Sequence, residues 1–124
     1  MNTYGVLLIA ALILNYGDWR MLALSLLAGV CAFMPVPMSY PEFYFLCFFG
    51  ELLIGMMALA LSANASSMIA TLSGMLAAFH GLGWLLNGYP VQSPYHAAVK
   101  ICEHAEIAAC IVLSKPIIRR PNGY

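Results

Sequence analysis

Apolar residues occupy most of this chain, in five segments separated by short polar or proline-containing breaks. The segments cover residues 3–14, 19–34, 42–63, 66–86 and 95–114. A bilayer hydrocarbon core of about 30 Å needs about 20 helical residues, so the last three segments are long enough and the first two are short. The pattern predicts an all-α integral membrane protein, a compact bundle of four to five short transmembrane helices in one domain over residues 1–124.

The breaks predict where the chain reverses. Residues 15–18 read Asn-Tyr-Gly-Asp, which favours a tight helical hairpin because Asn and Gly tolerate left-handed backbone and Asp can cap the next helix. An unbroken helix over residues 42–86 would be about 67 Å long, roughly twice the hydrocarbon thickness, so a turn is expected near Asn64. The other breaks contain prolines, and in the last helix we expect Ser93 as the cap, Pro94 in the first turn and Pro116 at the end.

Composition supports the membrane assignment. Of the 124 residues, 63% are hydrophobic and 8% charged, and the mean hydropathy is +0.86. A water-soluble domain of this size cannot bury so much apolar surface in one core. The formal net charge is zero, so no basic field is present to collect nucleic acid, and nucleic-acid binding is not expected.

The basic residues predict an orientation. Lys115, Arg119 and Arg120 follow the last segment, which places the carboxyl terminus in the cytoplasm by the positive-inside rule. Five spans also place Arg20 inside, whereas four spans and an interfacial last helix place it outside. Five spans are therefore preferred.

The last segment carries an unusual set of ionisable residues. At about 100° per residue, His96, Lys100, Glu103 and His104 share one arc, with Glu106 at its edge, while Ile101 and Ala105 lie opposite. Charges at membrane depth cost about 2.5–3.5 kcal/mol each on insertion scales. Two interpretations stay open: a proton or ion path along this arc, or an interfacial helix whose polar face is solvated.

Glu51 is the second ionisable feature, because it lies deep in the segment 42–63 among Phe and Leu residues. Desolvation favours the neutral acid, which can donate a hydrogen bond to a neighbouring helix. Its role is either structural or that of a relay, and Lys100 or His104 are its expected partners if the last helix spans.

Metal and haem sites have weak support. Cys31, Cys47, Cys102 and Cys110 lack CxxC spacing, and most of them are expected to be small buried hydrophobic residues. His96 and His104 are eight residues apart, about 12 Å along a helix, which is too far for one metal ion. No metal site is predicted. Haem held by His80 with His96 or His104 remains a minor alternative.

Small residues recur along the segment 66–86, which allows two helix backbones to approach closely. The stripe contains Ser66, Ala70, Gly74 and Ala78, with Ala77 and Gly81 as a second small pair. Its partner is a helix of the same chain or of another subunit, and packing within the chain is the simpler expectation.

No catalytic motif is present, so enzymatic activity is not expected. Three functions remain. The first is a self-associating bundle that forms a pore or conducts ions, holin-like or channel-like. The second is an accessory or anchor subunit of a larger membrane complex, which helps to hold haem or quinone. The third is a proton-coupled transporter protomer centred on Glu51. All three place the chain in a lipid bilayer, as a homo-oligomer or within a larger complex.

Overall fold

The structure is a computed structural model that describes residues 2–33, 41–86 and 94–118. All regular secondary structure in these ranges is α-helical, which confirms the all-helical prediction. The helices are α1 (Thr3–Leu14), α2 (Trp19–Phe33), α3 (Pro41–Leu61), α4 (Ser66–Leu85), α5 (Pro94–Val112) and the single turn α6 (Lys115–Ile118).

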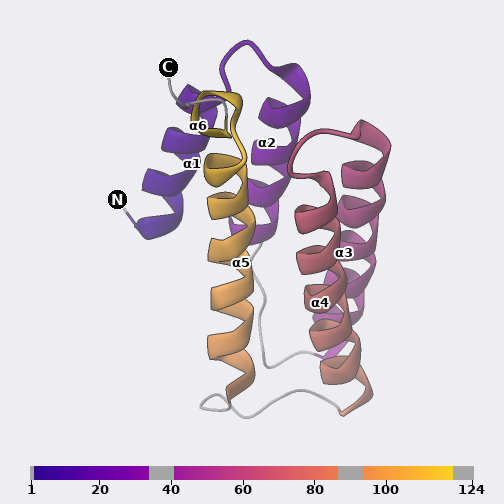
Figure 1. The fold of residues 1–124 in the computed structure, drawn as a ribbon. Helices are drawn as coiled ribbons and strands as arrows, with labels where there is room; N and C mark the ends of the chain where they lie inside the picture. The colour runs from indigo at the N-terminus through magenta and orange to yellow at the C-terminus, as the bar shows by residue number, and fades with distance from the viewer. Residues whose placement is uncertain (1, 34–40, 87–93, 119–124) are drawn as a thin grey trace.

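The long helices lie side by side as a bundle (Figure 1). Helices α3 and α4 form a long hairpin on one side, and α1 and α2 form a shorter hairpin. Helix α5 lies between them and contacts α1, α2 and α4. This central position determines the environment of the polar residues that α5 carries.

The two hairpin turns use different residues to reverse the chain. In the first turn Gly17 has a φ of 94°, a left-handed conformation that glycine adopts without strain. The turn between α3 and α4 lies near Asn64, as expected, and its left-handed residue is Ser62, with a φ of 52°. Asn64 donates a hydrogen bond of 3.4 Å to the Leu113 carbonyl.

Both hairpin turns and the end of α5 meet at one end of the bundle (Figure 1). The Asn64 to Leu113 contact joins the second turn to the residue that follows α5. The Lys115 ammonium lies 3.6 Å from the Asp18 carboxylate, which joins the first turn to α6. The first residues of α3 and α5 therefore lie at the opposite end (Figure 1). Residues 34–40 and 87–93, which include the predicted cap Ser93, are outside the described part.

The last helix ends earlier than expected. Pro116 was expected to end it, but α5 stops at Val112 and Pro116 is the second residue of α6. Proline is tolerated there because the first-turn amides of a helix have no intrahelical partner. The break therefore comes before the proline, at Leu113 and Ser114.

Two helices are long and apolar enough to cross a membrane by length and composition. They are Tyr44–Leu61 in α3, of which 28% is buried within the bundle, and Ser66–Leu85 in α4, of which 39% is buried. Helices α1 and α2 are apolar but shorter. Much of the surface of α3 and α4 is thus exposed on the outside of the bundle, including Leu46, Met56 and Leu85.

Candidate functional site

Helix α5 turns its acidic side chains inward and an apolar one outward. The Glu103 side chain is 8% exposed and Glu106 is fully buried, whereas Ile101 is 68% exposed. The cause is the central position of α5, which faces α1, α2 and α4 at once. The interpretation of a solvated polar face is therefore wrong for Glu103 and Glu106.

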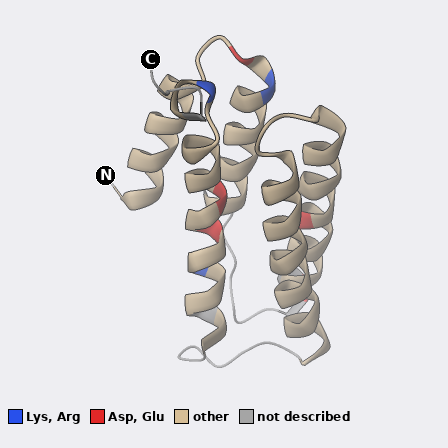
Figure 2. Ribbon diagram, viewed as in Figure 1, with Lys and Arg blue, Asp and Glu red and all other residues tan. Residues whose placement is uncertain are grey.

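Each acidic side chain in the interior has a hydrogen-bond donor from a different helix. The Tyr4 hydroxyl of α1 donates to Glu103 Oε1 at 3.0 Å. The Ser73 hydroxyl of α4 donates to Glu106 Oε2 at 2.9 Å. The Cys31 thiol of α2 donates to Glu51 Oε2 of α3 at 2.7 Å. All five long helices thus contribute to one polar interior. Figure 2 shows acidic positions part-way along α5 and part-way along the α3–α4 hairpin, in addition to the acidic position in the first hairpin turn.

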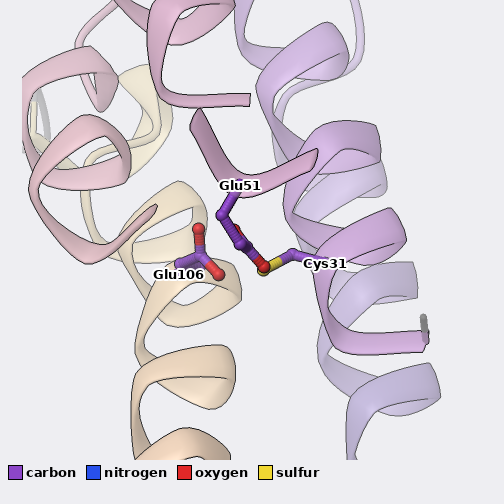
Figure 3. Close-up of side chains that lie close together, drawn as sticks. All are labelled: Cys31, Glu51 and Glu106. Atoms are coloured by element: carbon purple, nitrogen blue, oxygen red, sulfur yellow. The ribbon is translucent and has the colours of Figure 1, made fainter. Parts of the chain in front are cut away.

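Cys31, Glu51 and Glu106 form the densest part of this interior, which we call the acid–thiol cluster. The Cys31 sulfur and one oxygen from each carboxyl group all lie within 4.8 Å of one another. Figure 3 shows the three side chains pointing toward each other from three helices. Oxygen Oε1 of Glu51 and Oε1 of Glu106 have no hydrogen-bond partner among the described residues. The cluster can therefore bind a proton or a cation.

In the part of the chain that the structure describes, no recorded ion pair involves Glu51 or Glu106. Among the described residues, the recorded ion pair joins Lys115 to Asp18 at the end of the bundle. Burying a carboxylate without a positive partner is costly. The carboxyl groups consequently need a proton or a bound cation to be stable in this interior.

A groove between α3 and α4 reaches the acid–thiol cluster from the outer surface. It has a volume of about 180 Å³, and Glu51 lines it together with Gly55, Ala70 and Gly74. A second, more apolar groove of about 620 Å³ runs between α1 and α5, where Lys100 and His104 line it with Leu7. Glu51 is 2% exposed, so its side chain closes the inner end of the first groove.

The other predicted residues of α5 lie apart from the acid–thiol cluster. Lys100 is exposed. His104 is half-buried, with its ring 4.1 Å from the Tyr4 ring and its Nδ1 2.8 Å from the Lys100 carbonyl. The expected pairing of Glu51 with Lys100 or His104 is not found; Glu51 contacts Cys31 instead, because α3 faces α2 at this level. The side chain of His96 is outside the described set.

His80 of α4 is buried beside two tyrosines. Its Nδ1 lies 2.7 Å from the Leu76 carbonyl, and its ring centroid is 6.3 Å from that of Tyr44 and 6.1 Å from that of Tyr95. His104 has a different aromatic neighbour, Tyr4. The minor haem alternative gains no support from the surroundings of these two imidazoles.

The small-residue stripe of α4 passes from the interior to the outer surface. Ser66 is buried and its hydroxyl accepts the Ala63 amide at 2.7 Å, and Ala70 is half-buried. Gly74 and Ala78 are exposed, and no atom would lie within 4 Å of a Cβ at Gly74. Gly81, by contrast, faces Phe48, whose ring would lie 3.2 Å from an added Cβ.

Sequence reasoning identified the acidic residues of this site but missed their partners. Cys31, Ser73 and Tyr4 are ordinary residues in apolar helices, and nothing in their spacing marks them. Cys31 is twenty residues from Glu51 and lies on another helix. Only a prediction of which helices are neighbours could have found them.

The sequence matches no protein-family model, no curated protein and no solved structure.

Proposed function

We propose that this chain is an integral membrane protein that self-associates and transfers protons through its buried carboxyl groups. The observation that carries the proposal is the burial of Glu51, Glu103 and Glu106 inside a bundle whose outer surface is apolar. Intramembrane acidic residues are costly and typically mark proton or ion pathways.

The distribution of side chains supports a lipid environment. A water-soluble helical bundle hides apolar residues and exposes charged ones, but α5 does the reverse with Ile101 and Glu106. Large apolar side chains are also exposed along α3 and α4, and monomeric soluble proteins rarely expose large contiguous apolar patches.

The bundle geometry fits five spans. The end that holds both hairpin turns also holds Arg20, the second residue of α2, and Lys115, and Arg119 and Arg120 follow in the sequence. The positive-inside rule assigns this end to the cytoplasm. Helices α1 and α2 have 12 and 15 residues, about 18 and 22 Å, so tilting cannot extend them and the bilayer must thin around them.

The partners of the carboxyl groups suit proton transfer. A hydroxyl group can donate and accept a hydrogen bond at the same time, and a thiol can do so weakly. Tyr4, Ser73 and Cys31 therefore stabilise a carboxylate when it loses its proton and let the proton return. Neighbouring carboxyl groups, such as Glu51 and Glu106, favour states in which one proton is retained.

Self-association is supported by the exposed part of the stripe on α4. Gly74 and Ala78 leave the helix backbone uncovered on the outer surface, where the helix of a second copy can approach closely. A chain of 124 residues also encloses little interior space by itself. Association of several copies can enclose a proton path that one chain is too small to enclose.

Proton flux into liposomes tests the proposal. The purified full chain, reconstituted with a pH-sensitive dye inside the vesicles, should acidify the lumen when a potassium gradient and valinomycin set the membrane potential. Glu103→Gln and Glu106→Gln should each lower the flux at least tenfold, whereas Glu42→Gln, an exposed acid at the start of α3, should leave it unchanged.

Two results would count against the proposal. One is flux no higher than in empty vesicles, and the other is full flux in both α5 variants. A purified particle that contains other proteins in fixed ratio would instead support the accessory-subunit alternative.

A further inference from the structure

We propose that Cys31, Glu51 and Glu106 form a binding site for a divalent transition-metal ion of the Zn²⁺, Fe²⁺, Mn²⁺ and Co²⁺ class. The inference rests on the proposed function, since the metal ion is the species that these carboxyl groups exchange for protons. Nothing in the sequence spacing predicts such a site, because its three donors come from α2, α3 and α5.

The geometry is close to what a metal ion requires. The sulfur and the two carboxyl oxygens lie within 4.8 Å of one another. Ligands at about 2.0 Å for oxygen and 2.3 Å for sulfur in tetrahedral coordination are about 3.3–3.5 Å apart. Side-chain rotations that shorten the longest separation by little more than about 1 Å complete the site, without movement of the helices.

The second observation is a pair of buried oxygens without partners. Glu51 is 2% exposed and Glu106 is fully buried, yet Oε1 of each lacks a hydrogen bond among the described residues. Buried polar atoms are almost always paired, so orphaned ones indicate a missing ion or water. The other oxygen of Glu106 accepts from Ser73, a contact that fixes the carboxylate as an outer partner fixes a metal ligand.

The donor set selects the kind of ion. Mg²⁺ and Ca²⁺ are hard ions that bind oxygen ligands, and the Cys31 sulfur in this donor set disfavours both. Cu⁺ prefers sulfur ligands, and here one thiol faces two carboxyl groups. One thiolate with two carboxylates suits borderline divalent ions, and three protein ligands leave an open position through which the ion can exchange.

Metal binding at this site must release protons. The thiol loses its proton when sulfur binds the metal, and at least one carboxyl group does the same, so at least two protons pass to water for each ion. A divalent ion with one thiolate and one carboxylate carries no net charge. This neutrality suits an interior in which no cationic side chain of the described residues forms an ion pair with the cluster.

A groove between α3 and α4 borders the site at Glu51. Its other lining residues are small or apolar, namely Leu52, Gly55, Met56, Leu59, Ala70 and Gly74, and the 2% exposed Glu51 closes its inner end.

Cobalt binding to the purified, chelator-treated full chain in detergent micelles tests the inference. We expect one Co²⁺ per chain, a thiolate-to-cobalt charge-transfer absorption in the near ultraviolet, its loss on addition of Zn²⁺ but not of Mg²⁺, and release of at least two protons to a weakly buffered dye. Cys31→Ser should abolish the absorption, and Glu51→Gln and Glu106→Gln should weaken Co²⁺ binding at least tenfold.

Matched variants separate the site from general effects. Glu42→Gln should bind Co²⁺ as the natural chain does, and a variant with Cys47, Cys102 and Cys110 all replaced by serine should keep the absorption, since Cys31 remains. The absorption of this second variant identifies Cys31 as the thiolate ligand even if Cys31→Ser unfolds and loses its helical circular dichroism. Absence of the absorption in the natural chain, or its persistence without Cys31 in a folded variant, overturns the inference.

The outcomes for the metal site and for the proposed function are distinguishable. Proton flux in chelator-treated liposomes without Co²⁺ binding removes the metal site and leaves proton transfer intact. Co²⁺ binding that requires Cys31, in vesicles without proton flux, leaves the metal site and removes proton transfer.

Discussion

Glu51 and Glu106 are placed side by side at a cost to the stability of the bundle. Both are buried, each has one oxygen without a partner, and no ion pair offsets them among the described residues. A purely structural role would be served better by neutral side chains, because an apolar or amide group avoids the desolvation of a carboxylate. Residues kept at a cost to stability are often functional ones.

We therefore expect Glu106→Gln to stabilise the chelator-treated protein, by about 1 kcal/mol. The amide oxygen still accepts the Ser73 hydroxyl, and the amide nitrogen can donate to the free oxygen of Glu51. Unfolding in detergent micelles by titration with dodecyl sulfate, followed by circular dichroism, measures the change. Glu42→Gln is the exposed control, and a loss of stability in Glu106→Gln alone would show that the carboxylate is structural.

The residues of the site differ in how visible they are in the sequence. A carboxyl group in an apolar segment is conspicuous, so Glu51 and Glu106 stand out without a structure. Cysteine is a common buried residue, so Cys31 does not. The expected partner of Glu51 was a cation of α5, and the actual one is a thiol of α2, because helix packing and not charge complementarity sets the neighbours.

At the scale of elements, a buried asparagine joins the first hairpin to the central helix. The Asn15 amide nitrogen donates to the Ala11 carbonyl at 2.8 Å and to the Cys110 carbonyl of α5 at 2.9 Å. The first contact closes the end of α1, and the second fixes the level of α5 relative to that hairpin. Glu103 can therefore meet Tyr4 near the other end of α1.

Asn15→Asp should destabilise the bundle by about 1–3 kcal/mol, because an aspartate cannot donate to the Cys110 carbonyl and its carboxylate lies in the interior. The Ala11 carbonyl keeps the backbone amide of residue 15, at 3.0 Å. The same dodecyl sulfate titration measures the loss. Asn64→Asp is a matched control, since Asn64 also donates to a carbonyl next to α5 but is exposed and its contact is 3.4 Å long. Equal effects of the two substitutions would show that the Asn15 contacts do not hold α5.

The sequence predicts which polar residues share an arc on α5, but it does not predict which of them face the interior of the bundle. Helical periodicity places Lys100 and Glu103 close together on that arc. In the structure Glu103 is buried and Lys100 is exposed, because α1 covers only part of the surface of α5. Which part of the arc is covered depends on the length and position of the neighbouring helices. The periodicity of α5 contains no information about those helices.

At the scale of the whole molecule, one glycine of α4 packs within the chain, and another is left open for packing between chains. Gly81 faces Phe48 of α3, whereas Gly74 faces open space. The two glycines lie on the same helix and would be expected to respond alike from sequence alone. The structure predicts opposite consequences for their substitution.

Gly74→Leu should lower the oligomeric mass in detergent, measured by light scattering after size exclusion. The stability of the single chain toward unfolding should stay the same or increase. If the natural chain is monomeric in detergent, α4 is not an association surface.

Gly81→Leu should destabilise the chain by about 1–3 kcal/mol, because a Cβ at 3.2 Å from the Phe48 ring leaves no room for a leucine.

Chemical labelling of an introduced cysteine distinguishes a lipid-facing surface from a water-facing one. Cys102 and Cys110 cannot make the distinction, because the bundle itself buries both. Ile101→Cys places a thiol on the outer side of α5, where the natural side chain is 68% exposed, and Tyr16→Cys places one in the first hairpin turn, at 88% exposure. In native membranes opened to a membrane-impermeant maleimide from both sides, we expect rapid labelling at position 16 and none at 101, with both labelled after denaturation. A bundle in water would present both thiols to the reagent, so equal rates would show that the apolar surface of α5 does not face lipid.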